Sequence, residues 1–218
     1  MLCSFCVLTL LTGHNSLLIS FSAHCYMKIV PVACLYAGKI DMLERVKEAI
    51  MVHQTNKTAI MFGMAAAFLL ESIILGADLK EALERVAEKC IIAGWDDVSA
   101  ACRRALSEAK SASLEELMQK MTDEKLGGRT CHFPSAFIVP MFLFHQAVAD
   151  GEVNEEAYIK ALRANILAAG DTCSRAVFIG AVLGACVEKV PKTWEDKFDK
   201  ETLKKIDQAT KEILESFG

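Results

Sequence analysis

The sequence has no excess of basic residues, since 24 Lys and Arg stand against 28 Asp and Glu and give a formal net charge of −4 at pH 7. Proteins that bind nucleic acids present a basic stripe or patch, so we expect no nucleic-acid partner. Proline and glycine are also scarce, at 4 and 12 residues, which excludes collagen-like and low-complexity chains.

Aromatic residues make up only 7% of the 218 residues, whereas 53% of the residues are hydrophobic. This apolar content excludes an intrinsically disordered chain, and the length is sufficient to bury one large core. Because aromatic rings are few, we expect that core to be aliphatic and rich in alanine.

The first 26 residues are apolar but lack a run long enough to cross a membrane. Cys6–Leu11 is similar to the apolar part of a secretory signal, but no Lys or Arg precedes it, and Gly13 interrupts the run. A membrane span needs about 20 apolar residues, so we expect no membrane span. We expect a cytoplasmic protein, with a signal at residues 1–20 as the alternative. The chain divides into an apolar leader, 1–26, and a helical domain, 27–218.

Nine cysteines are present, an odd number, and most lie within apolar helical patterns. Disulfide frameworks are typical of short, loop-rich secreted domains, and this chain is neither short nor rich in loops. We therefore expect reduced thiols that pack as small hydrophobic side chains.

Helix signals recur along the chain, and strands do not alternate with helices. Capping residues precede apolar patterns with helical spacing, and Gly127, Gly128 and Pro134 mark a break. The sequence predicts an all-α fold in which helices surround a buried central pair. The predicted helices are Asp41 to about His53, Thr55–Leu75, one from Asp78, Asp96–Ala109, one from Ser113, Ser135–Ala149 with Pro140 at a kink or in the first turn, Asn154–Ala169, Asp171 to about Lys189, and Thr202–Phe217.

Gly170-Asp171-Thr172-Cys173-Ser174 is the segment with the clearest chemical content. Three oxygen-bearing side chains, those of Asp171, Thr172 and Ser174, gather at a predicted helix N-terminus. The free N–H groups there favour an anion, and a carboxylate offsets the helix dipole enough to admit a cation. An ordinary N-cap uses the same residue types, so both interpretations stay open at this point.

This segment also carries a family resemblance. Together with the small-residue helix of Ile179–Ala185 and with Val190–Trp194, it resembles the C-terminal signature of the ADP-ribosylglycohydrolases. Met27–Pro31 and Gly127–Phe142 resemble two further stretches of that family. The resemblance implies a compact, orthogonal bundle of helices that lacks the family's N-terminal part.

Shorter stretches are similar to one branch of the family, the J-type lens crystallins and selenoprotein J, which descend from the hydrolases. These stretches are Val52–Asn56, Leu75–Gly76 and Thr130–Pro134.

The resemblance implies that active relatives hold two magnesium ions between an N-terminal Ser/Thr-Asp-Asp motif and a C-terminal D-x-D-[ST] motif. Asp171 and Ser174 match the first and last ligands of the C-terminal motif, whereas Cys173 stands in place of its second carboxylate. A thiol is a soft and poor ligand for magnesium. We therefore expect a vestigial metal site in a catalytically impaired protein, which is structural or binds an ADP-ribose-like ligand.

The candidate ligand contacts lie in three segments of the chain: Gly170, Thr172, His53, Cys131 and His132. The resemblance places His53 where many family members keep a histidine near ADP-ribose, although a histidine at a helix end commonly partners the helix dipole. Cys131 and His132 are adjacent, which is more typical of a structural loop than of two groups that converge on one ion. We expect Met27 and Lys28 in a loop, with His24 near the family's Asn-Gly position.

Two enzymatic alternatives stay open, and no catalytic residue is assigned for either. A working ADP-ribosyl hydrolase would need magnesium and replacement ligands. A thiol-dependent enzyme would use Cys131 or Cys173, since the resemblance to selenoprotein J implies a reactive residue. We also expect the chain to self-associate, because a missing N-terminal part leaves apolar helix surface exposed.

Overall fold

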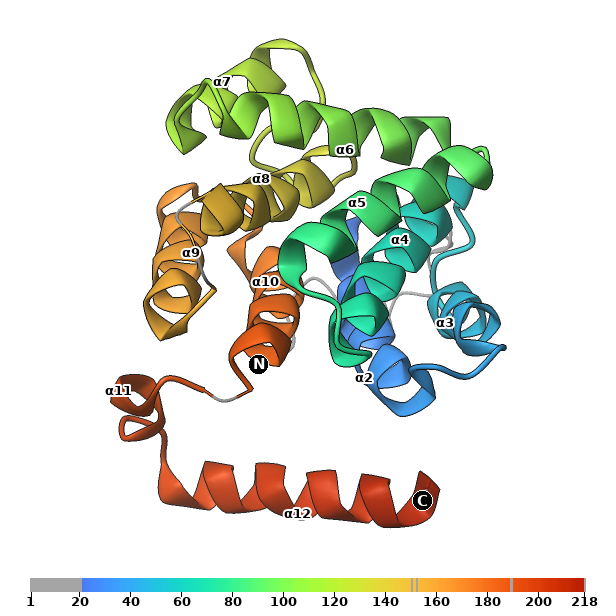
Figure 1. Cartoon of the computed structure of the whole chain (residues 1–218), viewed down its shortest axis with the longest axis vertical. Coiled ribbons are helices and arrows are strands. Elements are labelled where there is room, and N and C mark those ends of the chain that lie inside the picture. Colours follow the sequence, from blue (N-terminus) through green and yellow to red (C-terminus); the bar gives the residue numbers. More distant parts are fainter. Residues whose placement is uncertain (1–20, 150, 152, 189, 218) are drawn as a thin grey trace, which may run out of the picture.

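The structure, a computed structural model, describes residues 21–149, 151, 153–188 and 190–217. Across these residues it contains eleven α-helices, one 3-10 helix and no strand apart from an isolated bridge between Ser22 and His132, so the predicted all-α class is confirmed (Figure 1). Residues 1–20, where we expected the leader and the alternative secretory signal, lie outside the described part. The elements are η1 (Ala23–Cys25), α2 (Tyr26–Tyr36), α3 (Met42–Met51), α4 (Lys57–Ile74), α5 (Leu79–Ile92), α6 (Asp96–Ala109), α7 (Leu114–Asp123), α8 (Ser135–Ala149), α9 (Glu155–Leu167), α10 (Thr172–Val187), α11 (Lys192–Glu195) and α12 (Lys200–Phe217).

Local sequence determines where several helices begin. Asp78, Ser113 and Asn154 each accept a hydrogen bond from a backbone N–H in the first turn, which confirms their predicted capping role. The N-cap of α4 is Asn56 rather than Thr55, because the Asn56 side chain accepts a bond of 2.8 Å from the first turn.

α4 and α8 are the buried central helices that the sequence predicts. Both are apolar nearly all round, and α10 packs against both of them while α6 covers α8 (Figure 1). Pro140 lies in the buried interior of α8 and not in its first turn. By length and composition α4 could also cross a membrane, but 56% of that stretch is buried inside the molecule, as in the core helix of a globular protein.

The centre of the core is aromatic. The Phe62 ring stacks on Phe133 with centroids 4.6 Å apart and meets Phe137 edge-on at 5.1 Å. Phe178 on α10 lies 5.4 Å from Phe144 and 4.9 Å from Tyr26. Most buried core residues are aliphatic and alanine is the commonest of them, as expected, but several of the few aromatic residues gather inside and contact one another.

The helical body begins before the expected boundary at Met27. Ala23, Cys25 and Tyr26 are fully buried, and α2 packs against α3, α4 and α10. The expected loop at Met27 and Lys28 is wrong, since both residues lie in the first turns of α2. The family-like spacing of this segment suggested a loop, but its burial against three helices favours a helix.

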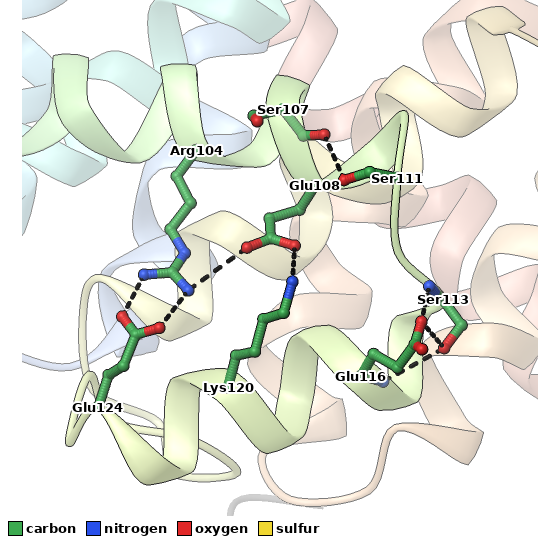
Figure 2. Close-up of polar contacts among 8 residues, drawn as sticks. All are labelled: Arg104, Ser107, Glu108, Ser111, Ser113, Glu116, Lys120 and Glu124. Carbon is green, nitrogen blue, oxygen red and sulfur yellow. Dashed lines mark hydrogen bonds and ion pairs between the residues drawn. The ribbon is translucent and has the colours of Figure 1, made fainter.

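Charged side chains join α7 to α6 on the surface of the molecule (Figure 2). Arg104 on α6 makes a two-pronged ion pair with Glu124, with N–O distances of 2.5 and 2.9 Å. Glu108, also on α6, accepts a bond of 2.8 Å from Lys120 on α7. Surface ion pairs contribute little singly, but Glu108 also lies 3.5 Å from Arg104 Nη2, so its carboxylate links the two pairs into a network that holds α7 on α6.

α12 lies apart from the bundle in Figure 1. Its described apolar side chains are largely solvent-exposed, including Ile206 at 51% and Ile213 at 43%. The self-association that we expect from exposed apolar helix surface stays a prediction.

We expect His145 on α8 to make stability depend on pH. Burial, and then the charge of Lys110, lower the pKa of His145 from 6.5 to about 4. Between these values the unfolded chain binds a proton that the folded chain does not, so stability that is present above pH 6.5 is lost as the pH falls toward 4. The loss amounts to about 2 kcal/mol near pH ~5.

Urea unfolding at a series of pH values measures this loss. The free energy of unfolding should show the pH dependence in the wild type and in His24→Gln but not in His145→Gln. The same pH dependence of the free energy in all three proteins would contradict the assignment to His145.

Candidate functional site

A tight crossing of two loops positions the Gly170–Ser174 segment. Gly170 has φ +74°, and a Cβ at this position would lie 1.8 Å from the carbonyl oxygen of Arg129. The next residue, Asp171, donates its backbone N–H to the same oxygen at 3.2 Å. Only glycine permits this approach, so Gly170 acts as a packing residue that fixes where α10 begins.

Asp171 is the N-cap of α10, as predicted. Its Oδ1 accepts a hydrogen bond of 3.3 Å from the backbone N–H of Ser174. Its second oxygen, Oδ2, is buried and has no hydrogen-bond partner. Ser174 is buried, Thr172 is half-buried, and Cys173 is exposed to solvent.

One turn further along α10, Arg175 is fully buried, and sequence patterns alone do not single it out. Its Nε donates a bond of 2.7 Å to Asn165 Oδ1 on α9, and its Nη2 donates to the carbonyl oxygen of Ala169. Its Nη1 is buried without a partner. Burial lowers the pKa of Arg175, while the charge of Asp171 acts in the opposite direction.

A second guanidinium lies on the crossing loop. Arg129 donates from Nη1 to the carbonyl oxygen of Ala168 and from Nη2 to Glu115 Oε1 at 2.7 Å. The charge of Arg129 also lowers the pKa of Arg175, so the two cations repel each other. The Asp171 carboxylate therefore has a buried arginine one turn away and a second arginine beside its backbone.

Tyr26 lies beneath this charged group. Its hydroxyl donates a bond of 3.3 Å to the carbonyl oxygen of Ala136. Burial raises the pKa of Tyr26 well above its usual value, and the negative charges of Cys25, if ionised, and of Asp171 raise it further. Tyr26 therefore remains a neutral hydrogen-bond donor.

The arrangement does not fit a pair of magnesium ions. Magnesium prefers near-octahedral coordination by oxygen ligands, and in the described residues no group of three or more His, Cys, Asp or Glu side chains could hold a metal ion. Asp171 Oδ2 is an orphaned carboxylate oxygen, but the positive charge of Arg175, one turn along α10, acts on the same carboxylate. The predicted metal residues Asp171 and Ser174 do come together, through the capping bond.

His53, the ligand contact expected from the family resemblance, lies just after α3. Its Nδ1 is buried without a hydrogen-bond partner. Burial, and then the charges of Lys28 and His24, lower the pKa of His53. The three basic side chains are therefore neighbours, and His53 is neutral at pH 7.

Cys131 and His132 connect the crossing loop to the start of the helical body. The Cys131 carbonyl oxygen accepts a bond of 2.8 Å from the Ala23 N–H, and the His132 ring lies 4.5 Å from the Phe21 ring. These contacts give both residues a structural role. Within the described chain, no hydrogen bond joins the Cys173 thiol to a histidine or a carboxylate that could serve as its base.

The comparison with known proteins identifies one family. The family profile described as ADP-ribosylglycohydrolase matches residues 9–218. A search of curated proteins gives no significant match.

Gly170→Ala should destabilise the fold far more than the same change at Gly94. Both glycines have a positive φ, +74° and +67°, but nothing lies within 4 Å of a Cβ added at Gly94. Gly94→Ala should cost about 1–2 kcal/mol of left-handed backbone strain, whereas Gly170→Ala must also displace the Arg129 backbone, at roughly 3 kcal/mol or more. Urea unfolding of the two variants measures the difference. Equal losses would show that the crossing is not tight.

Proposed function

The chain belongs to the ADP-ribosylglycohydrolase family, and on that premise we propose that it binds an ADP-ribose-like ligand without hydrolysing it. Family membership supports an ADP-ribosyl hydrolase-like function, and the family generally depends on magnesium. Unlike the magnesium-dependent members of the family, this chain would bind its ligand without magnesium. It would belong to the branch of the J-type crystallins and selenoprotein J.

The buried guanidinium of Arg175 is the observation that carries the proposal. A fully buried arginine cannot lose its proton or move its charge into water. A divalent cation at Asp171 would meet that charge in a poorly solvated environment, where repulsion is strong. Cys173, at the position of the second carboxylate, supplies no hard oxygen to offset it.

The same charges favour an anion. The N-terminus of α10 carries the positive end of the helix dipole, and Arg129 and Arg175 add two guanidinium groups around it. Phosphate groups bind readily at helix N-termini. The diphosphate of an ADP-ribose-like ligand therefore suits this end of α10 better than magnesium does.

A separate cavity offers room for a ring system. It has a volume of about 570 Å³ and is bordered by the aromatic rings of Phe21, Phe62 and Phe133 and by the charged Asp97 and Arg104. Aromatic faces bind planar rings, and polar groups at the rim fix their orientation. The cavity is therefore an observation in favour of a nucleotide-like ligand. None of the residues that we expected from the sequence to contact a ligand lines this cavity.

ADP-ribose should stabilise the protein equally in EDTA and in millimolar magnesium. A ligand that binds only the folded state raises Tm, and the site that we propose needs no metal. Differential scanning fluorimetry measures the shift, and an ADP-ribosylated arginine or serine peptide tests for hydrolysis in parallel. Release of ADP-ribose that requires magnesium and disappears in Asp171→Asn would overturn the proposal.

Restoring a metal site should require two changes. Cys173→Asp adds a carboxylate at an exposed position, but Arg175 still repels a cation. We expect magnesium to raise Tm in Cys173→Asp combined with Arg175→Gln, and in neither Cys173→Asp alone nor the control Cys34→Asp combined with Arg175→Gln. Cys34 is also exposed, so that control carries the same charge at another place. A full magnesium effect in Cys173→Asp alone would show that Arg175 is not the obstacle.

A further inference from the structure

A second cavity lies among α5, α6 and α8. It has a volume of about 670 Å³, which is within the range of pockets that hold small-molecule ligands. No residue of its described lining borders the cavity at Phe21, Phe62 and Phe133, and none belongs to the Gly170–Ser174 segment. An occupant of this cavity would therefore be distinct from the ADP-ribose-like ligand proposed above.

Helical spacing explains how three helices come to share one cavity. Side chains three or four residues apart lie on the same side of a helix, and the lining residues of each helix follow that spacing. They include Leu83 and Ala87 on α5, Leu106 and Ala109 on α6, and His145 and Val148 on α8. Each helix therefore turns one continuous side toward the cavity.

The wall of this cavity is aliphatic. Alanine and the branched side chains of Leu83, Leu106 and Val148 supply most of it, and the His145 imidazole is the only aromatic ring in its described lining. Leu106 stays 40% exposed to solvent, so an apolar occupant would remove further hydrocarbon from water. A wall that lacks phenyl faces suits a flexible hydrocarbon chain better than a planar ring.

The mouth of the cavity is cationic. Lys80, Arg103 and Lys110 all line it and are exposed, with Glu84 as the one acidic residue in the described lining. Among the residues that the structure describes, no ion pair joins any of these three cations to a carboxylate. Their charges therefore remain available to an anion at the mouth.

Two adjacent arginines on α6 show the contrast. Arg104 faces α7, where the carboxylates of Glu108 and Glu124 balance its charge (Figure 2). Arg103 lines the cavity instead, and its Nη1 donates a bond of 2.7 Å to the neutral hydroxyl of Ser99. The side of α6 toward the cavity therefore carries positive charge that the fold does not neutralise.

We propose that this cavity binds the free anion of an aliphatic carboxylic acid. The hydrocarbon chain would lie between α5, α6 and α8, and the carboxylate would accept charge-assisted hydrogen bonds from Lys80, Arg103 and Lys110. Burial of the chain supplies most of the affinity, since each methylene that leaves water strengthens binding about fourfold. The cations at the mouth then select an anionic head group over a cationic one.

Isothermal titration calorimetry of the full chain with hexanoate, octanoate and decanoate, below their micelle concentrations, tests the proposal. We expect one bound ion per chain and an affinity that rises about fourfold with each added methylene. Octylammonium has the same hydrocarbon chain as octanoic acid derivatives of that length but the opposite charge, and should bind at least about tenfold more weakly. Equal affinities for octanoate and octylammonium would overturn the proposal.

A matched pair of variants locates the hydrocarbon chain. Leu106→Glu puts a carboxylate into the wall, three and four residues from Arg103 and Lys110, and should abolish octanoate binding. Ile91→Glu makes the same change on α5 outside the cavity, at a side chain that is 63% exposed, and should leave binding intact. Equal octanoate affinities in the two variants would contradict the location. The chain-length series in the wild type decides the question even if a variant fails to fold.

A second pair of variants locates the carboxylate. Arg103→Gln combined with Lys110→Gln should weaken octanoate binding at least about tenfold and keep the fourfold increment per methylene. The control, Lys204→Gln combined with Lys211→Gln, removes the same charge from the exposed side of α12 and should change nothing. Equal affinities in the two double variants would overturn the proposal.

A second copy of this chain is the other occupant that the measurements detect. In that case octanoate would give no heat of binding, and Leu106→Glu would delay elution of the chain in size-exclusion chromatography. Either result would overturn the proposal. ADP-ribose should not displace octanoate, so a failure of the ligand under Proposed function leaves this test unaffected.

Discussion

The buried side chain of Arg175 is the interaction on which the site depends. Its guanidinium links α9, through Asn165, to the turn at Ala169 and to the start of α10. The neighbouring Arg129 reaches the end of α9 through the carbonyl oxygen of Ala168. A buried charge is tolerated only where it is well bonded, so the hydrogen bonds of the two arginines must be kept in the folded chain. These bonds fix the backbone turn before α10, and that turn positions Asp171.

Two further constraints make that geometry rigid. Gly170 passes the Arg129 backbone at a distance that no other residue allows, and the aromatic core lies directly beneath α10 at Phe178. Tyr26 connects the two regions, since its ring packs on Phe178 and the charge of Asp171 reaches its hydroxyl. The positive end of α10 is therefore held in place from both sides.

Features that depend on neighbours in the chain could be predicted from the sequence. The spans of α6 and α8 match the prediction residue for residue, and the caps at Asp78 and Ser113 are where expected, because capping and helical spacing are local properties. The N-cap role of Asp171 is also a local property, and it too could be predicted from the sequence.

Features that depend on tertiary packing could not be predicted in this way. Arg175 follows an ordinary N-cap motif, and nothing in its neighbours shows that α9 and the crossing loop bury it. The helix at Met27 and Lys28 was missed because its stability comes from packing against three other helices.

The binding of manganese tests the central claim most directly, because Mn²⁺ prefers the same oxygen ligands as magnesium and its free ion gives an electron paramagnetic resonance signal. The account predicts that the full chain leaves the free Mn²⁺ signal unchanged at equimolar concentrations. Loss of the signal corresponding to two bound ions per chain, restored by Asp171→Asn, would contradict it.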